Sequence, residues 1–240
     1  MRIDGRGPGD LRPITFRLDV NPYAEGSVEV SFGKTTLLIT ASVDRDRPKW
    51  LAEGAGGWIT AEYGMLPRAT HTRSGREASI GKQSGRTQEI QRLIGRALRA
   101  AVNLREIEGL MIRVDCDVLV ADGGTRTAAI SGGWLALRQA LERAAVEGLL
   151  PTPVTVRQIA AVSLGMVQGE PLVDLCYEED STADFDLNLV FNDQAHVIEI
   201  QGTAERTSLP NEELLRLLTL GESAARHVMA LQQAALATRG

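Results

Sequence analysis

The chain has 240 residues, of which 43% are hydrophobic and 24% are charged, so it can bury a sizeable core and is neither disordered nor low in complexity. Its net charge of −5 argues against a protein that binds nucleic acid over its whole surface. No apolar run reaches the roughly 18 residues of a membrane helix, and the first residues lack the apolar segment of a signal peptide, so a cytoplasmic protein without a membrane partner is expected.

Short runs of alternating or β-branched residues in the first third of the chain predict β-strands. They lie at residues 14–19, 27–31, 35–43 and 58–63. The pair Gly33-Lys34 predicts a hairpin turn between the second and third runs. Residues 67–84 are polar and predict a long loop, and loops of this length in compact domains are usually functional or disordered.

The clearest predicted helix follows this loop. From Ile90 to Ala101, apolar residues recur at i, i+3, i+4, i+7, i+8 and i+11, which gives the helix one apolar face. Arg86 falls at the start of this helix. The stretch 68–105 holds nine basic and two acidic residues, a local charge of +7, which suits either a polyanion bound at one place or a solvated face or subunit interface.

A strand, a turn and a second helix are predicted next. Residues 112–120 alternate as a strand that ends at Asp122-Gly123-Gly124, and a helix is expected from Thr125 to about residue 147. The tract around Pro151 and Pro153 is the one candidate internal boundary.

The second half predicts further strands and a C-terminal helix. The strands are expected at residues 162–167, 172–177, 184–191 and 196–201, and the helix from about Pro210. The buried stripe of the helix is expected at Leu214, Leu217, Leu218 and Val228. Both cysteines, Cys116 and Cys176, are expected as buried thiols within strands. Strands with segregated helices indicate an α+β fold.

The turn at residues 122–126 is the first candidate site. A helix N-terminus offers unpaired N–H groups and the positive end of the helix dipole, and the glycines let an anion approach the backbone. With Thr125 and Arg126 as additional donors, this arrangement predicts a phosphate site, although a glycine turn with Thr125 as a plain N-cap fits the same residues. Arg86 is a second candidate, because a guanidinium donates two parallel hydrogen bonds to phosphate.

The other candidate site is an acidic cluster in the second half, made of Glu178, Glu179, Asp180, Asp184 and Asp186. In a strand, Asp184, Asp186 and Asn188 point to one face, beside a turn that carries Asp180. Hard oxygen ligands of this kind suit Mg²⁺ or Mn²⁺, whereas the solvated face of an edge strand explains the same pattern. The sequence has no histidine spacing for zinc, no Cys-x-x-Cys pair and no Gly-x-Ser-x-Gly elbow.

These candidates lie within longer strings that resemble bacterial ribonuclease PH along nearly the whole chain. The strings are RIDGRGPGDLRP, GWITAEYGMLPRATHTRSGREASIGKQSGRTQEIQRLIGRALRA, DCDVLVADGGTRTAAISGG and DLCYEEDSTADFDLN. Long strings in this order are far more specific than any short motif.

The resemblance implies a ribonuclease PH-like fold with mixed sheets, helices packed against them and two similar βα sub-regions, at about residues 10–150 and 154–235, in one compact subunit of residues 1–240. It implies a phosphorolytic 3′→5′ exoribonuclease that trims tRNA precursors and other RNAs, releases nucleoside diphosphates and runs in reverse as a nucleotidyltransferase. It also implies a homohexamer built as a trimer of dimers.

The resemblance assigns roles to individual residues. It implies inorganic phosphate bound by Arg86, Gly124, Thr125 and Arg126. It implies catalytic, metal-linked carboxylates at Asp180 and Asp186, with Asp184 beside them. The loop arginines Arg68, Arg73 and Arg76 match positions associated with RNA engagement or ring assembly, and the helix arginines Arg92, Arg96 and Arg99 stay open between RNA and a subunit interface.

The expected mechanism uses inorganic phosphate as the nucleophile, so positioning and charge neutralisation dominate. The proton for the leaving 3′ oxygen comes from a metal-bound water or from a carboxyl, Asp184 or Asp186, and the sequence leaves this open. Two alternatives are a non-catalytic RNA-binding ring subunit of an exosome-like assembly and a small-molecule enzyme with an anion site. The first is disfavoured because Arg86, Arg126, Asp180 and Asp186 are all present.

Overall fold

The hairpin at Gly33-Lys34 lies within a five-stranded sheet, in which Phe32 pairs with Thr35 across the turn. The computed structural model describes residues 2–45 and 48–239. The strands are β1 (Ile14–Leu18), β2 (Gly26–Phe32), β3 (Thr35–Asp44), β4 (Trp58–Met65) and β5 (Met111–Val120). Their order is β1-β2-β3-β5-β4, and β4 pairs with β5 in parallel whereas the other pairs are antiparallel.

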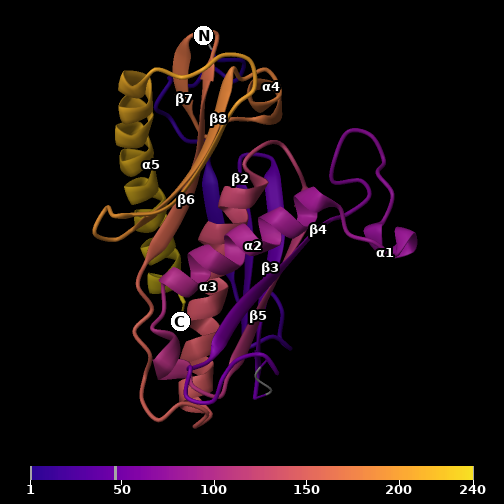
Figure 1. Cartoon of the computed structure of the whole chain (residues 1–240), viewed down its shortest axis with the longest axis vertical. Helices are drawn as coiled ribbons and strands as arrows, with labels where there is room; N and C mark the ends of the chain where they lie inside the picture. The colour runs from indigo at the N-terminus through magenta and orange to yellow at the C-terminus, as the bar shows by residue number, and fades with distance from the viewer. Residues whose placement is uncertain (1, 46–47, 240) are drawn as a thin grey trace.

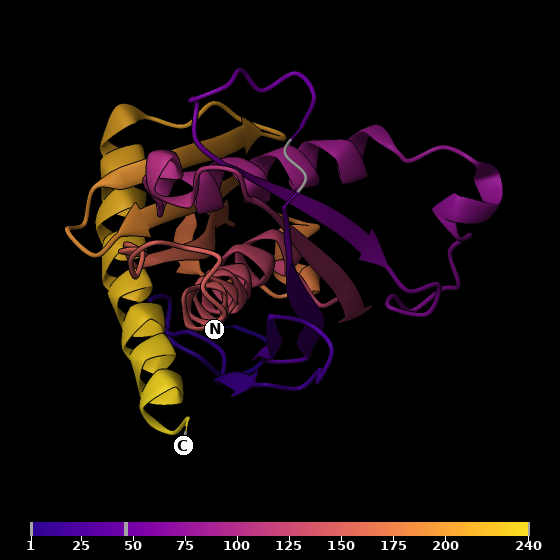
Figure 2. The same ribbon diagram turned by 90° about the horizontal axis from the view of Figure 1, so that it is seen from below.

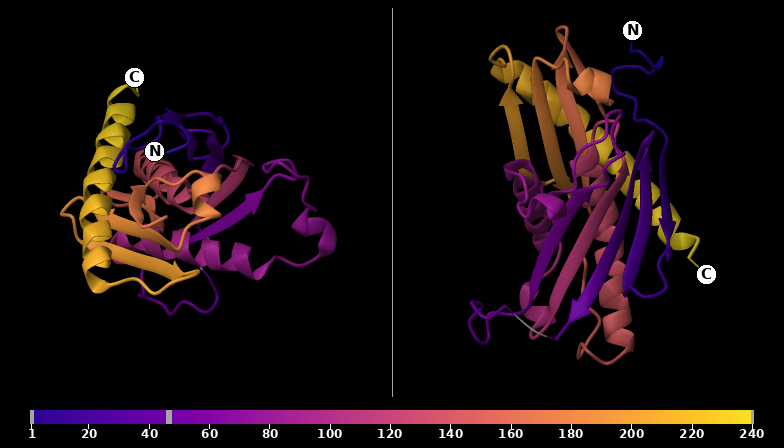
Figure 3. Two further views of the ribbon diagram at one scale, coloured as in Figure 1. Left: turned by 90° about the horizontal axis from the view of Figure 1, so that it is seen from above. Right: turned by 90° about the vertical axis from the view of Figure 1, so that its right-hand side faces the viewer.

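A second sheet of four antiparallel strands is built from the second half of the chain (Figure 3). Its strands are β6 (Ile159–Val167), β7 (Glu170–Val173), β8 (Phe185–Asn192) and β9 (Val197–Ala204), in the order β7-β6-β8-β9. In β8, Leu187 and Leu189 enter the core while the alternating polar residues face the other way, because side chains alternate across a strand.

Helix α3 (Thr125–Val146) packs against both sheets and forms the centre of the molecule (Figure 1). Because it is covered on nearly all sides, most of its residues are buried, including Trp134. A Cβ added at Gly132 would lie 2.7 Å from the Ile39 side chain, so the helix approaches the first sheet closely there.

The other two long helices cover the flanks of the sheets. Helix α2 (Gly85–Ala100) packs on β4, and α5 (Asn211–Ala237) packs on β6 (Figure 2). The buried Gln232 of α5 donates to the carbonyls of Ser131 and Ile159, at 2.9 and 3.1 Å. Short helical turns complete the chain, at α1 (Glu77–Ile80), η1 (Leu104–Ile107) and α4 (Tyr177–Asp180). In the described part of the chain, no helix is both long and apolar enough to span a membrane.

The structure confirms the α+β class and corrects one predicted strand. The run 172–177 was expected as a strand, but β7 ends at Val173 and Asp174 takes a positive φ of 53°. The chain then turns into α4, where Glu179 closes a capping box with the backbone of Cys176. Cys176 is therefore buried but lies before a helix, whereas Cys116 is buried within β5 as predicted. Of the predicted stripe on α5, Leu217 and Val228 are fully covered, and Leu214 and Leu218 are half-buried.

Candidate active site

A cleft of about 660 Å³ opens between the N-terminal ends of α2 and α3, the end of α4, and strands β8 and β9. It is lined by the two predicted phosphate arginines, Arg86 and Arg126, and by the two predicted metal carboxylates, Asp180 and Asp186. Four residues from distant parts of the sequence, two basic and two acidic, therefore meet at one place where the two sheets adjoin.

The turn at Asp122-Gly123-Gly124 connects β5 to α3. Arg126, the second residue of α3, lines the cleft, whereas Gly124 and Thr125 are not among the lining residues that the structure describes. Gly123 and Gly124 take φ values of 76° and 69°, which glycine adopts at the lowest cost. A Cβ at Gly123 would lie 2.4 Å from the carbonyl oxygen of Leu175, so this position also requires glycine sterically. Gly124 is the N-cap of α3, and with no side chain it leaves the first N–H groups of the helix free of a side-chain cap within the described residues.

Thr125 is the first residue of α3 and not its N-cap, so the plain N-cap interpretation of Thr125 is wrong. Its hydroxyl is buried and lies 2.8 Å from the hydroxyl of Tyr63, on β4. The hydroxyl of Tyr63 on β4 thus fixes the position of the Thr125 side chain.

Arg126 enters the cleft from the first turn of α3. One terminal nitrogen lies 3.5 Å from a carboxylate oxygen of Glu89, on α2. Its Nε is buried and, among residues 2–45 and 48–239, has no hydrogen-bond partner. Arg86 is exposed in the first turn of α2, a turn fixed by Ser84, which accepts a hydrogen bond from the Thr87 N–H at 3.1 Å.

Asp186 lines the cleft from β8, where the charges of both Asp180 and Arg126 act on it. One of its carboxylate oxygens is buried and lacks a hydrogen-bond partner in the part of the chain that the structure covers. Burial, with the charge of Asp180 as the next cause, raises the pKa of Asp186. Asp180 keeps solvent contact at the cleft rim, but desolvation raises its pKa too and outweighs the opposing charge of Arg126.

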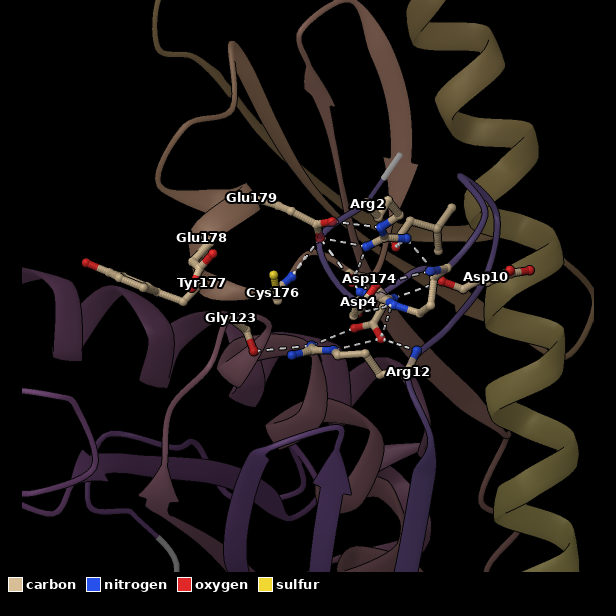
Figure 4. A network of polar contacts seen from close by, with 12 residues as sticks. Arg2, Asp4, Asp10, Arg12, Gly123, Asp174, Cys176, Tyr177, Glu178 and Glu179 are labelled. Carbon is tan, nitrogen blue, oxygen red and sulfur yellow. Dashed lines mark hydrogen bonds and ion pairs between the residues drawn. The ribbon is translucent and has the colours of Figure 1, made fainter.

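The remainder of the predicted acidic cluster does not join these two carboxylates. Asp184 precedes β8 and is not in the cleft lining that the described residues form, and its carbonyl accepts the N–H of Glu205 at 3.0 Å. Glu179 points away from the cleft to Arg2, at 2.7 Å (Figure 4). Across the described ranges, no group of three or more His, Cys, Asp or Glu side chains is arranged to hold a metal.

The arginines predicted to contact RNA or a subunit interface fall into two groups, those exposed to solvent and those paired within the subunit. Arg68, Arg73 and Arg76 are exposed on the loop 67–84, as is Arg92 on α2. Arg76 lines a second cleft of about 630 Å³ together with Lys82, and Arg86 lines both clefts, so the two adjoin.

Two arginines of α2 are engaged within the subunit. Arg96 forms an ion pair with Glu199 of β9, with its Nε at 3.1 Å. Arg99 lies over the ring of Trp58 at 4.4 Å and donates to the carbonyl of Ile59 at 2.8 Å.

Sequence reasoning missed part of the cleft. The additional lining residues with polar side chains are Glu89, Ser181, Gln201, Thr203, Glu205 and Arg206. A signal for three of them was present, because residues 201, 203 and 205 alternate as one face of β9 and its extension. Asp186 pairs directly with Thr203, which brings this face beside the acidic face of β8.

Comparison with known proteins decides the family. The model of the first domain of the 3′ exoribonuclease family matches residues 10–141, and the model of its second domain matches residues 157–224. The chain belongs to the 3′ exoribonuclease family. Proteins named ribonuclease PH in two strains of Caulobacter vibrioides are each 51% identical to this chain over 236 residues. The match covers 98% of this chain and 99% of each relative; the strains are NA1000 / CB15N and ATCC 19089 / CIP 103742 / CB 15.

Solved structures within this 3′ exoribonuclease fold extend the likeness. Rice (Oryza sativa) Rrp46 superposes on this chain with a TM-score of 0.81 at 18% identity. The superposition covers 99% of this chain and 100% of the Rrp46 chain. The Archaeoglobus fulgidus exosome with RNA bound to the active site gives a TM-score of 0.81 at 25% identity, over 95% of this chain and 91% of that one. The predicted family, α+β fold and exoribonuclease activity are thereby confirmed, and the non-catalytic alternative is less supported.

Proposed function

We propose that the chain is a phosphate-dependent 3′→5′ exoribonuclease that removes nucleotides from the 3′ ends of tRNA precursors and other RNAs. The observation that carries this proposal is the pair of buried, unpartnered polar atoms of opposite sign, Arg126 Nε and the Asp186 oxygen, that the described residues leave in one cleft. Buried polar atoms of this kind ordinarily have partners, so the cleft is suited to an anion and a cation together. Ribonuclease PH relatives at 51% identity support the phosphorolytic reaction.

Inorganic phosphate would be held at the N-terminus of α3. Arg86 and Arg126 supply guanidinium donors, and the N–H groups of Gly124, Thr125 and Arg126 add the positive end of the helix dipole. Because the Thr125 hydroxyl already meets Tyr63, we assign the phosphate contact of Thr125 chiefly to its backbone N–H.

A divalent cation, Mg²⁺ or Mn²⁺, would be held by Asp180 and Asp186. Mg²⁺ in proteins is often held by only one or two carboxylates, with waters and substrate phosphate oxygens completing its shell, so two carboxylates fit this ion. When bound, the ion would neutralise charge on the scissile phosphate. Among the described residues, the Asp186 oxygen without a hydrogen-bond partner is the ligand atom best suited to this cation.

The reaction balances without a side-chain nucleophile. An oxygen of inorganic phosphate bonds to the phosphorus of the terminal nucleotide, and the bond from that phosphorus to the preceding 3′ oxygen breaks. The leaving oxygen takes a proton from water, because Asp186 would be ionised as a ligand of the cation and Asp184 does not line the cleft that the described residues form. The products are a nucleoside diphosphate and an RNA shortened by one nucleotide, and the reverse reaction adds nucleotides.

RNA would reach this site along the adjoining cleft. Arg76, Lys82 and Arg86 line or border it, and the exposed Arg68, Arg73 and Arg92 extend the basic surface. Arg96 is a weaker candidate for RNA because Glu199 neutralises it. We also propose that the protein is a cytoplasmic homohexamer, a trimer of dimers, of subunits with sub-regions at about 10–150 and 154–235. The likeness to a chain of the Archaeoglobus fulgidus exosome supports an oligomer.

Single substitutions in the cleft test the assigned roles. Arg126→Ala and Asp186→Ala should each lower turnover on the order of 10²-fold or more, since one charge-assisted contact contributes a few kcal/mol in the transition state. The matched control is Arg216→Ala, which removes an exposed arginine of α5 that pairs only loosely with Glu213, at 3.7 Å. Turnover near that of the wild type in either cleft variant would refute the assignment.

A further inference from the structure

Arg12, just before β1, lies buried between the two halves of the candidate active site. Its side chain and that of Asp174 are 4% and 2% exposed. The Nε and one terminal nitrogen of Arg12 donate to the two carboxylate oxygens of Asp174, at 3.0 and 2.7 Å. The backbone N–H of Arg12 also donates to Asp174, at 2.8 Å.

The remaining N–H groups of the same guanidinium reach the turn at Asp122-Gly123-Gly124, hereafter the phosphate turn. One terminal nitrogen donates to the carbonyl of Asp122. The other lies 3.4 Å from the carbonyl of Gly123 (Figure 4). Arg12 therefore bridges two segments that are far apart in sequence. Asp174 begins the segment that leads to Asp180, and the Asp122-Gly123 carbonyls immediately precede the N-terminus of α3.

Two further contacts join the same segments. The N–H of Tyr177, at the start of α4, lies 3.3 Å from a carboxylate oxygen of Asp122. Gly123 packs against the backbone of Leu175 and Cys176 so closely that no Cβ fits. These contacts place the turn at 122–124 directly against the start of α4.

We propose that Arg12 is a positioning residue that fixes the phosphate turn relative to Asp180 and so couples phosphate binding to cation binding. This inference rests on the proposed function of the cleft. A planar guanidinium can satisfy two carboxylate oxygens and two carbonyls at once, whereas the compact ammonium of lysine has only three donors at a single point. A positive charge without the planar arrangement of the guanidinium N–H groups would not bind both Asp174 and the turn at 122–124.

Arg2 provides a matched control. It is also a buried arginine, and it holds Glu179 and the carbonyls of Val173 and Asp174 at 2.7 to 3.0 Å. Among the contacts of the described residues, those of Arg2 stay on the α4 side and near the N-terminus and do not reach the turn at 122–124. Arg2 therefore supports one half of the site, while Arg12 bridges both.

The test compares Arg12→Lys, Arg2→Lys and Asp174→Asn in phosphorolysis of a labelled RNA. In Arg12→Lys, the KM for inorganic phosphate and the Mg²⁺ concentration for half-maximal rate should both rise, on the order of tenfold, while the KM for RNA stays within twofold. Asp174→Asn should show the same paired rise, because asparagine tolerates the positive φ of 53° but loses the charge that orients Arg12. In Arg2→Lys, the phosphate KM should stay within twofold.

Thermal unfolding of each variant separates positioning from stability. A lower midpoint with unchanged KM for phosphate and unchanged Mg²⁺ requirement in both Arg12→Lys and Asp174→Asn would overturn the proposal, as would an equal phosphate effect in Arg2→Lys. Asp174→Asn keeps the test valid should Arg12→Lys fail to fold. Failure of the proposed function would be distinguishable, because the wild type itself would then shorten RNA without phosphate or would not shorten it at all.

Discussion

At the scale of single residues, Asp186 combines a buried oxygen that lacks a partner among the described residues with a raised pKa. A carboxyl whose folded pKa lies above its unfolded value binds more protons when folded, so its ionisation lowers stability as pH rises through the folded pKa. At neutral pH the charged form therefore costs stability. Sites that bind a ligand often carry such a cost, because the ligand supplies the missing partner.

We expect Asp186→Asn to raise the thermal midpoint at pH 7 in the absence of divalent cations while it abolishes most activity. The gain should shrink as pH falls toward about 4, near the ordinary pKa of aspartate, because the wild-type carboxyl becomes protonated there. Thermal unfolding followed by circular dichroism at both pH values measures this. A lower midpoint for the variant at pH 7 would show that the Asp186 charge is already compensated within the subunit.

At the scale of elements, the turn between β5 and α3 depends on Gly123 for two separate reasons, its φ of 76° and the close approach of Leu175. Gly109 offers a control, since it has a φ of 81° but a Cβ there would meet nothing within 4 Å in the described structure. Gly109→Ala should cost about 1 kcal/mol from backbone strain alone. Gly123→Ala should cost roughly 1–3 kcal/mol more, from overpacking.

Urea unfolding of both glycine variants measures the two costs. Equal losses for Gly123→Ala and Gly109→Ala would mean that the turn can move away from Leu175 freely. Such freedom would also weaken the case that the phosphate turn and α4 move together.

The local periodicity of apolar residues predicted most helices and strands, and a contact between residues far apart in the sequence explains the strand that was predicted wrongly. The apolar period from Ile90 to Ala101 predicted α2, and alternation predicted β5 and β8, because both signals lie within one element. The strand expected at 172–177 failed because the turn at Asp174 is held by Arg12, which lies 162 positions away.

The candidate site was predicted to a similar extent. Arg86, Arg126, Asp180 and Asp186 were identified from the chemistry of their side chains, and the resemblance to ribonuclease PH favoured the phosphate and metal roles over the alternatives, whereas Glu89, Glu205 and Arg206 were missed. The separation of Asp184 and Glu179 from the cleft was not predicted, because β8 begins only at Phe185 and because Glu179 pairs with Arg2, which lies 177 positions away in the sequence.

At the scale of the whole molecule, a chain with net charge −5 carries nine of its 26 basic residues, with only two acids among them, in residues 68–105, which include α2 and the loop that precedes it. That loop, with α1, extends away from the body of the subunit (Figure 1). Its exposed arginines Arg68, Arg73 and Arg76 are free to meet RNA or a neighbouring subunit, and the two roles give different measurements.

We expect the triple variant Arg68→Ala, Arg73→Ala and Arg76→Ala to bind RNA more weakly, with a smaller dependence of log Kd on log salt. Each lost phosphate contact should reduce that slope by about 0.7 for single-stranded RNA, so three contacts account for about two. Arg17→Ala, an exposed arginine of β1, is the control. A reduced molar mass in light scattering with an unchanged slope would instead assign these arginines to assembly.

The most direct test of the account is the dependence of RNA shortening on inorganic phosphate. A labelled tRNA with a short 3′ extension would be incubated with the protein and Mg²⁺, with and without phosphate, and the products identified. We predict shortening only with phosphate, with release of nucleoside diphosphates. Release of nucleoside monophosphates without phosphate, or no shortening at all, would contradict the assignment of the cleft as a phosphorolytic active site.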